Sequence, residues 1–253
     1  MLVGKMVGEG EQPLVCTPLV GKTRDAILAE LHHIVDKKPD MIEWRADYFD
    51  EITNLPEVVL MAKQIVENKD DIPVIFTLRS KSEGGFFEAN SPEERLAIIA
   101  AVCEGSGVAY VDYELSNPPE QIRKLRHLTK ATNTKIIASF HDFNRMPPRE
   151  ALLEKIAAAK EYGADVAKIA VMPNCLEDVL TLLSVTLEAK KIIDIPVITV
   201  SMGSCGVASR LLGGIFGSAV TFAVGHDSSA PGQIPIEDLK TVLAIVHKSM
   251  NGK

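Results

Sequence analysis

The sequence lacks the features of a secreted, membrane-bound or nucleic-acid-binding protein. None of its apolar runs reaches the roughly 18 residues that a membrane-spanning helix needs. The N-terminal segment has no charged head followed by a long apolar run, so we expect no signal peptide. The 253 residues carry a formal net charge of −7 and contain no long basic run. Nucleic acid and anionic membrane surfaces are therefore not expected as partners.

Motifs for disulfides, metals and dinucleotides are also missing. There is no HExxH motif and no Cys/His cluster, and no Gly-rich GxGxxG follows the first apolar run. We therefore expect no metal and no dinucleotide. The cysteines are far apart and form no CxxC pair, which indicates reduced thiols in a cytoplasmic protein. These four residues are Cys16, Cys103, Cys175 and Cys205.

Short β-branched runs alternate with segments of helical period along the chain. The candidate strands are residues 14–20, 41–46, 73–79, 108–115, 135–141, 166–172, 196–202 and 220–225. The helical patterns are residues 23–37, 56–69, 91–107, 148–163, 176–191 and 235–250. The strands start roughly 25–35 residues apart, which is the length of one βα unit. Because an open sheet of this many strands would be large, we predict one (β/α)8 TIM barrel over residues 1–253.

A lysine lies in the middle of the predicted strand 166–172. Strand alternation puts Ala167, Ile169 and Val171 on one face, which suits the covering helices, and turns Lys168 toward the barrel axis. Burial among small apolar neighbours disfavours a lysine's charged form, and a neutral amine is a nucleophile for carbonyl carbon. The alternative is a structural lysine that pairs with a carboxylate.

A histidine and a glutamate are placed to serve that lysine. His141 ends the preceding strand, so it should lie beside Lys168 at the C-terminal rim, where barrel enzymes have their active sites. A histidine beside an amine nucleophile is suited to proton transfer, although a lone histidine at a strand end is as often structural. Glu83, in the loop after the third strand, could reach His141 and select its tautomer.

Charged residues elsewhere indicate a small anionic ligand. Glu43 and Arg45 share the inward face of the second strand, which suggests an ion pair organised around a polar ligand. Arg79 and Arg210 would add two more arginines at the rim, and this set suits a carboxylate, although each alone could form a surface salt bridge. Met202 faces inward at the end of the seventh strand. The segment after the eighth strand, a usual place for a mobile lid, adds Ser229 and Gln233.

Six motifs taken together resemble the type I 3-dehydroquinate dehydratases of the shikimate pathway. They are EWR (43–45), TLRS with EGG (77–85), SFHDF (139–143), ADVAKIAVMP (164–173), SRLLGGIFGSA (209–219) and SAPGQI (229–234). The resemblance covers essentially the whole chain, in the family's order and spacing. Two positions depart from some relatives, Val200 in place of Met and Pro18 in place of Ser, and both concern the lining of the pocket.

The resemblance implies a cofactor-free lyase that converts 3-dehydroquinate to 3-dehydroshikimate through a Schiff base, with syn elimination. It implies a Schiff base on Lys168, acid/base catalysis by His141, and orientation of that histidine by Glu83. It also implies aromatic amino-acid biosynthesis as the pathway and a homodimer as the assembly. The substrate-binding roles fall on Glu43, Arg45, Arg79, Met202, Arg210, Ser229 and Gln233.

Two other interpretations stay open on the sequence alone. A class I aldolase or transaldolase also uses a barrel lysine, but such enzymes usually bind phosphate through Gly-rich loops after the seventh and eighth strands. This chain has Arg210 and SAPGQ at those places. A non-catalytic barrel that binds a shikimate-type ligand is the second alternative, and it would have no need of a nucleophile in mid-strand.

Overall fold

The computed structural model describes residues 6–252. Its strands are β1 (Leu14–Leu19), β2 (Met41–Arg45), β3 (Val74–Thr77), β4 (Tyr110–Glu114), β5 (Lys135–Asp142), β6 (Val166–Val171), β7 (Val197–Ser201), β8 (Val220–Val224) and β9 (Ile234–Pro235). Its α-helices are α1 (Arg24–Asp36), α2 (Leu55–Glu67), α3 (Pro92–Ser106), α4 (Pro119–Thr132), α5 (Arg149–Glu161), α6 (Leu176–Ile192), α7 (Val207–Phe216) and α8 (Ile236–Met250). Two short 3-10 helices, η1 (Ala46–Tyr48) and η2 (Lys81–Glu83), follow β2 and β3.

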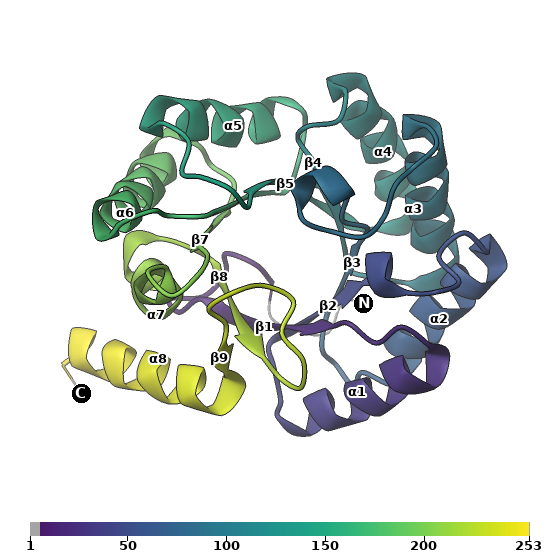
Figure 1. The fold of residues 1–253 in the computed structure, drawn as a ribbon, viewed down its shortest axis with the longest axis horizontal. Coiled ribbons are helices and arrows are strands. Elements are labelled where there is room, and N and C mark those ends of the chain that lie inside the picture. The colour runs from purple at the N-terminus through teal and green to yellow at the C-terminus, as the bar shows by residue number, and fades with distance from the viewer. Residues whose placement is uncertain (1–5, 253) are drawn as a thin grey trace.

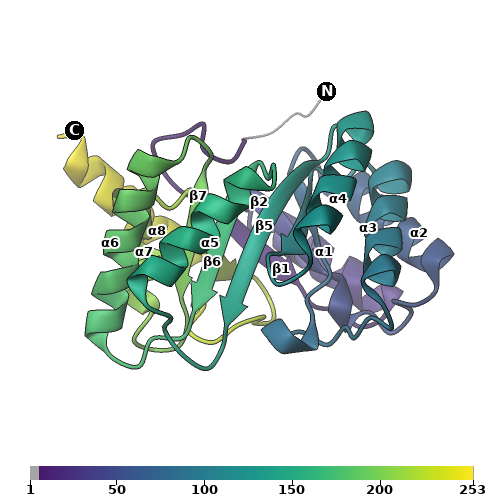
Figure 2. The ribbon, with the colours of Figure 1, turned by 90° about the horizontal axis from the view of Figure 1, so that it is seen from above.

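The strands form a ring with the helices outside it (Figure 1). They pair in the order β7-β6-β5-β4-β3-β2-β1-β8-β9, every pair parallel, and Figure 2 shows β5 and β6 pointing to the same side. β7 and β8 close the ring through a short contact, in which the Ala219 N–H donates to the Val197 carbonyl at 2.8 Å. Ser218 Oγ supports this contact by accepting from the Thr199 N–H at 3.0 Å. The predicted (β/α)8 barrel is confirmed.

The helices differ from the prediction more than the strands do. α4 and α7 complete the ring, although no helical pattern was assigned to either segment from the sequence, and the two-residue β9 was not expected. α7 contains Gly213 and Gly214, which weaken the helical signal of a sequence. α4 buries Ile122, Leu125 and Thr129 with an ordinary helical period, so its pattern was available. No helix within residues 6–252 is long and apolar enough to cross a membrane.

Strand side chains alternate between two hydrophobic clusters. The outer cluster, between sheet and helices, contains Trp44 and Ile169, and the inner cluster, inside the barrel, contains Val166 and Ala170. The predicted faces of β6 are therefore confirmed. Because Lys168 lies between two inner-cluster residues, the strand alternation points its side chain into the barrel.

Candidate active site

All the residues that were predicted to act in a site line one pocket. It lies where the strands end and encloses about 480 Å³ of space, part of it open to solvent. The predicted residues that line it are Glu43, Arg45, Arg79, Glu83, His141, Lys168, Met202, Arg210, Ser229 and Gln233. The other lining residues are Phe143, Ala170, Val200, Phe222 and Ala230. Among the described residues, no group of three or more His, Cys, Asp or Glu could hold a metal ion.

The Lys168 amine is buried between two carboxylates. Its Nζ lies 3.2 Å from Glu43 Oε1 and 3.2 Å from Asp112 Oδ2, and its side chain is 6% exposed. The ring of Phe222, on β8, lies with its centroid 4.7 Å from Nζ. An ammonium held in this way must release a proton before its nitrogen can attack a carbonyl carbon. The pocket therefore needs a base.

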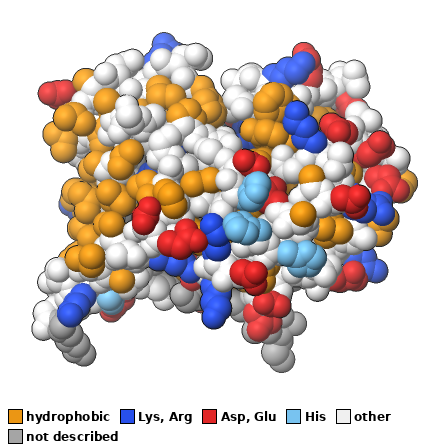
Figure 3. All heavy atoms as spheres, turned by 60° about the horizontal axis from the view of Figure 1, so that its bottom comes forward, with side chains coloured by type: hydrophobic (Ala, Val, Ile, Leu, Met, Phe, Trp, Pro, Cys, Tyr) orange, Lys and Arg blue, Asp and Glu red, His pale blue; other side chains and the backbone are white. Residues whose placement is uncertain are grey.

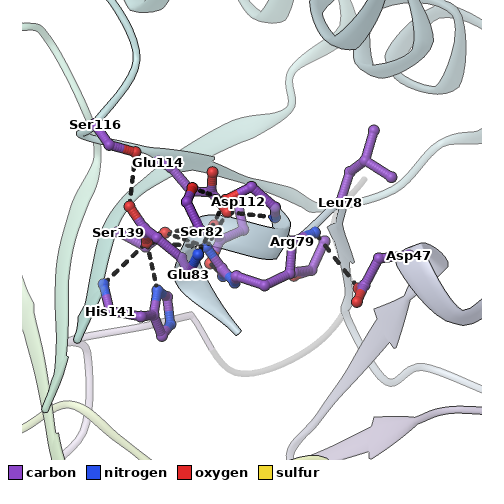
Figure 4. Close-up of polar contacts among 12 residues, drawn as sticks. Asp47, Leu78, Arg79, Ser82, Glu83, Asp112, Glu114, Ser116, Ser139 and His141 are labelled. Carbon is purple, nitrogen blue, oxygen red and sulfur yellow. Dashed lines mark hydrogen bonds and ion pairs between the residues drawn. The ribbon is translucent and has the colours of Figure 1, made fainter. Parts of the chain in front are cut away.

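His141 is oriented as such a base by Glu83 (Figure 4). The imidazole Nδ1 lies 3.0 Å from Glu83 Oε2, which also accepts from the His141 backbone N–H at 2.9 Å. Ser116 Oγ donates to the other oxygen, Oε1, at 2.7 Å. Because the carboxylate accepts hydrogen bonds, we assign the ring proton to Nδ1, and Nε2 keeps its lone pair. The contact that the sequence suggested is present.

Burial and nearby charges set the protonation of this pair. Burial, together with the positive charges of Arg79 and Lys168, holds the pKa of His141 well below its usual value. Burial raises the pKa of Glu83 to about 7, although the positive charge of Arg79 opposes this. The imidazole is thus neutral near pH 7, and a neutral imidazole is the form that can accept a proton.

A tight turn places the Glu83 carboxylate beside His141 on β5. Ser80 caps η2 by accepting from the Glu83 N–H at 3.3 Å, and Gly84 ends it with a φ of 80° in the left-handed region. A Cβ atom at Gly84 would come within 2.4 Å of the Phe143 ring. Glycine is therefore required at this position both by the backbone conformation and by the space.

Arg79 is the centre of a buried network of charges (Figure 4). Its guanidinium lies 2.8 Å from Asp112, 3.1 Å from Glu114 and 3.7 Å from Glu83, and it donates to Ser139 Oγ at 3.0 Å. Burial disfavours the charge, but the three carboxylates outweigh burial and raise the pKa of Arg79. It is therefore a permanent cation under the site. Asp112 and Glu114 were not expected at the site, although they alternate on β4 as Glu43 and Arg45 do on β2.

The predicted ion pair between Glu43 and Arg45 is wrong. Arg45 Nε and Nη2 instead donate to the two carboxylate oxygens of Asp47, both at 2.8 Å. Glu43 Oε1 accepts from Thr77 Oγ1 at 2.9 Å and from Lys168. The reason is local: the chain turns into η1 directly after Arg45, which brings the next carboxylate alongside it.

Arg210 is buried without an acidic partner in the part of the chain that the structure describes. Its Nη2 donates to the Pro231 carbonyl at 3.0 Å and its Nη1 to the Phe222 carbonyl at 3.4 Å, whereas Nε has no hydrogen-bond partner. Burial lowers the pKa of Arg210 to about 10. A buried guanidinium with unused donors at the edge of a pocket is suited to bind a carboxylate.

The segment between β8 and α8 brings two further polar side chains to the pocket. Gln233 Oε1 accepts from the Ser229 N–H at 3.0 Å, and its amide group donates to Ser229 Oγ at 3.3 Å. The segment is attached to the loop after β7, where the Gly203 N–H donates to the Pro231 carbonyl at 3.2 Å. Gly232 has a φ of 76°, and a Cβ atom there would lie 2.3 Å from the Gly203 carbonyl oxygen. This close approach holds the segment beside Arg210.

Known proteins resemble this chain in both sequence and structure. The family model described as type I 3-dehydroquinase matches residues 15–250. The 3-dehydroquinate dehydratase of Aromatoleum aromaticum is 50% identical over 250 residues, covering 99% of this chain and 96% of the relative. The crystal structure of 3-dehydroquinate dehydratase from Geobacillus kaustophilus gives a TM-score of 0.92 at 43% identity, covering 94% of this chain and 93% of that one. The type I 3-dehydroquinate dehydratase of Clostridium difficile gives 0.91 at 40% identity, covering 96% and 95%. Because sequence and fold both match over nearly the whole chain, this protein belongs to the type I 3-dehydroquinase family.

Proposed function

We propose that this chain carries out the reaction of its family, the dehydration of 3-dehydroquinate to 3-dehydroshikimate, through an imine on Lys168. One observation carries the proposal. A buried amine reaches the pocket from the middle of β6, and the neighbouring strand carries, next to its last residue, a histidine that a carboxylate orients. Amine and imidazole are the two groups that imine chemistry needs, and neither depends on a metal or a cofactor.

The protons balance within this pair of residues. The Lys168 ammonium gives one proton to His141, and the neutral amine then attacks the ring ketone. His141 returns the proton to the carbinolamine hydroxyl, which leaves as water, and a protonated imine remains. The imine withdraws electrons from the adjacent C–H bond. His141 takes that proton and gives it to the departing hydroxyl on the same face, which is a syn elimination, and water finally hydrolyses the imine.

The anionic end of the substrate matches the unpaired arginine. Arg210 would bind the substrate carboxylate, because its guanidinium has unused donors and lacks an acidic partner among residues 6–252. Ser229 and Gln233 lie on the segment beside it and would complete the carboxylate site. The ring hydroxyls and the apolar side of the ring would meet Glu43, Arg45, Arg79 and Met202.

Trapping the imine tests this function directly. The enzyme is incubated with 3-dehydroquinate and borohydride, and its peptides are analysed by mass spectrometry. We expect a stable adduct on the peptide that carries Lys168, and none in the Lys168→Ala variant. Lys155→Ala, on α5 outside the barrel, is the matched control and should keep the adduct. An adduct on another lysine, or tighter binding of a sugar phosphate than of 3-dehydroquinate, would contradict the proposal.

We also propose that two copies of the chain associate through the outer face of α6 and α7. These helices pack against each other, and Figure 3 shows hydrophobic side chains gathered on this side of the molecule. α6 has acidic residues in its first turn and lysines in its last, so two antiparallel copies would place opposite charges together. The exposed apolar side chains of this face are Leu176, Leu180, Leu187, Leu212 and Ile215.

Light scattering tests this association. Leu180→Glu puts a charge into the apolar face, where the side chain is 65% exposed, and should convert a dimer into a monomer. Leu60→Glu makes the same change on α2, at a side chain that is 39% exposed, and should leave the dimer intact. A wild-type protein that is monomeric at all concentrations would contradict the proposal.

The state of the cysteines supports a reducing compartment. All four are free thiols, and two of them, Cys175 and Cys205, are exposed. We propose that the protein acts in the cytoplasm, where exposed thiols stay reduced. Fractionation of the source cells would test this location.

A further inference from the structure

Asp112 lies behind the Lys168 amine and is absent from the lining of the pocket. Asp112 is buried, with 3% of its surface exposed. Oδ2 lies 3.2 Å from Lys168 Nζ and 2.8 Å from Arg79 Nη2, and Oδ1 accepts from Ser139 Oγ at 2.6 Å. Both oxygens are therefore held by groups from β5, from β6 and from the end of β3. The carboxylate cannot turn away without losing several contacts.

Glu43, the second carboxylate at Lys168, has different surroundings. Its Oε1 accepts from Lys168 and from Thr77, but its side chain also lines the pocket. A bound substrate can therefore reach Glu43 and compete for it. A substrate cannot reach Asp112 in this way, because the Lys168 amine lies between that carboxylate and the pocket.

The difference matters once an imine has formed. An ammonium has three N–H donors and can serve both carboxylates, whereas a protonated imine has a single N–H donor and keeps the positive charge. Burying a positive charge without a nearby anion carries a large desolvation cost, and a carboxylate in contact offsets that cost. The imine must also stay protonated, because its charge is what draws electrons from the adjacent C–H bond.

We propose that Asp112 is a positioning residue that provides the fixed counter-charge of the protonated imine on Lys168. This inference rests on the imine chemistry proposed above. Burial alone would raise the pKa of Asp112, but the positive charges of Arg79 and Lys168 outweigh burial and hold the pKa at about 2. The carboxylate therefore stays ionised and accepts a hydrogen bond from the imine without taking its proton.

Other titratable groups also act on this nitrogen. Besides the two carboxylates, they are the thiol of Cys16 on β1 and the imidazole of His141 on β5, and the guanidinium of Arg79 after β3 shares the Asp112 carboxylate with the amine. Burial raises the pKa of Cys16 well above its usual value, and His141 is neutral near pH 7. Within the described residues, Glu43 and Asp112 are therefore the anions in contact with the amine.

The test compares two variants that each remove one carboxylate from Arg79. Asp112→Asn also removes a charge at Lys168, whereas Glu114→Gln does not, because the carboxylate of Glu114 contacts Arg79, Arg95 and the Ser80 N–H, and Lys168 pairs with Glu43 and Asp112. Turnover of 3-dehydroquinate is measured from neutral to alkaline pH. Cyanoborohydride, which reduces protonated imines, traps the adduct in parallel.

For Asp112→Asn, we expect the alkaline limit of kcat and of trapping to move about one to three pH units lower, because an opposite charge raises the pKa of a nearby cationic acid by that amount. KM should change less than kcat does at alkaline pH. In Glu114→Gln the alkaline limit should stay where it is in the wild type. Asp112→Glu, which keeps the charge, should recover part of the shift.

Each outcome bears on one of the two proposals. A wild-type enzyme without an adduct would overturn the proposed function itself. A wild-type adduct, with the same alkaline limit in Asp112→Asn and Glu114→Gln, would overturn the role of Asp112 alone. A uniform loss of kcat at every pH would also overturn it, because that is the result of a purely structural residue. If Asp112→Asn does not fold, Asp112→Ala takes its place, and added formate should then move the alkaline limit back upward.

Discussion

Replacing Arg210 by methionine should change the stability of the free protein little while weakening its binding of substrate. Burial lowers the pKa of this guanidinium from 12.5 to about 10, so the folded state holds the charge less readily than the unfolded state does. At about 1.4 kcal/mol per pKa unit, the buried charge costs about 3 kcal/mol of stability at any pH well below 10. The charge is lost only as the pH rises above that value, so the cost is fully present at pH 7.

The methionine keeps the apolar stem but loses two hydrogen bonds, to the Pro231 and Phe222 carbonyls. A hydrogen bond from a charged donor contributes about 1.5–3 kcal/mol, so the loss of the two bonds should roughly offset the gain of about 3 kcal/mol from removing the buried charge. Urea unfolding of the ligand-free protein measures this balance. Substrate affinity should fall by about tenfold to a hundredfold, since a charge-assisted contact to a carboxylate contributes roughly 1.5–3 kcal/mol.

Arg45→Met is the matched control, because it removes a buried arginine that has a carboxylate partner. Asp47 would be left as an uncompensated charge, and the ligand-free protein should lose about 3–5 kcal/mol. The same chemical change should thus destabilise the protein strongly at position 45 and little at position 210. An Arg210→Met protein that is destabilised as much as Arg45→Met and keeps its substrate affinity would refute the reasoning.

The remaining predictions concern the acid/base pair and the absence of a metal. His141→Ala should still form the imine slowly, but kcat should fall about 10²–10⁴-fold, and a variant within about threefold of the wild type would exclude the acid/base role. Because burial raises the pKa of Glu83 to about 7, its carboxylate becomes protonated as the pH falls below that value and stops accepting from His141. The acid limit of kcat should therefore lie near pH 7 and disappear in Glu83→Gln; an unchanged acid limit in that variant would assign it to another group. Dialysis against a chelator should leave kcat unchanged, and a loss that added zinc or magnesium restores would show a metal requirement.

Much of the barrel could be predicted because its strands obey a simple rule. Alternation along β6 separates residues that pack under the helices from residues that face the axis, and the structure has Ile169 and Val166 on the expected sides. The same rule turns Lys168 inward, and the order of neighbouring strands puts His141 beside it. α7 escaped prediction because its glycines weaken the helical pattern, and it is held in place by packing against β7 and β8.

The partners of the buried charges could not be predicted in this way. Alternation says which side chains face the axis, but every inward carboxylate is then a possible partner for every inward cation. The choice depends on distances across the barrel and on the conformation of the loops, which are set by the packing of the whole chain. Thus the turn into η1 brings Asp47 next to Arg45, and Glu43 contacts Lys168 instead.

The barrel, the inward lysine and the polar residues at the rim could be predicted from the sequence alone, because each follows from a local period or from the order of the strands. The three-dimensional structure was needed to show that Asp112 lies behind the amine and that Arg210 has no acidic partner among the described residues. Both facts concern which charges meet in a region from which water is excluded. There a difference of a few ångströms separates a paired charge from an unpaired one, and no period in the sequence records that distance.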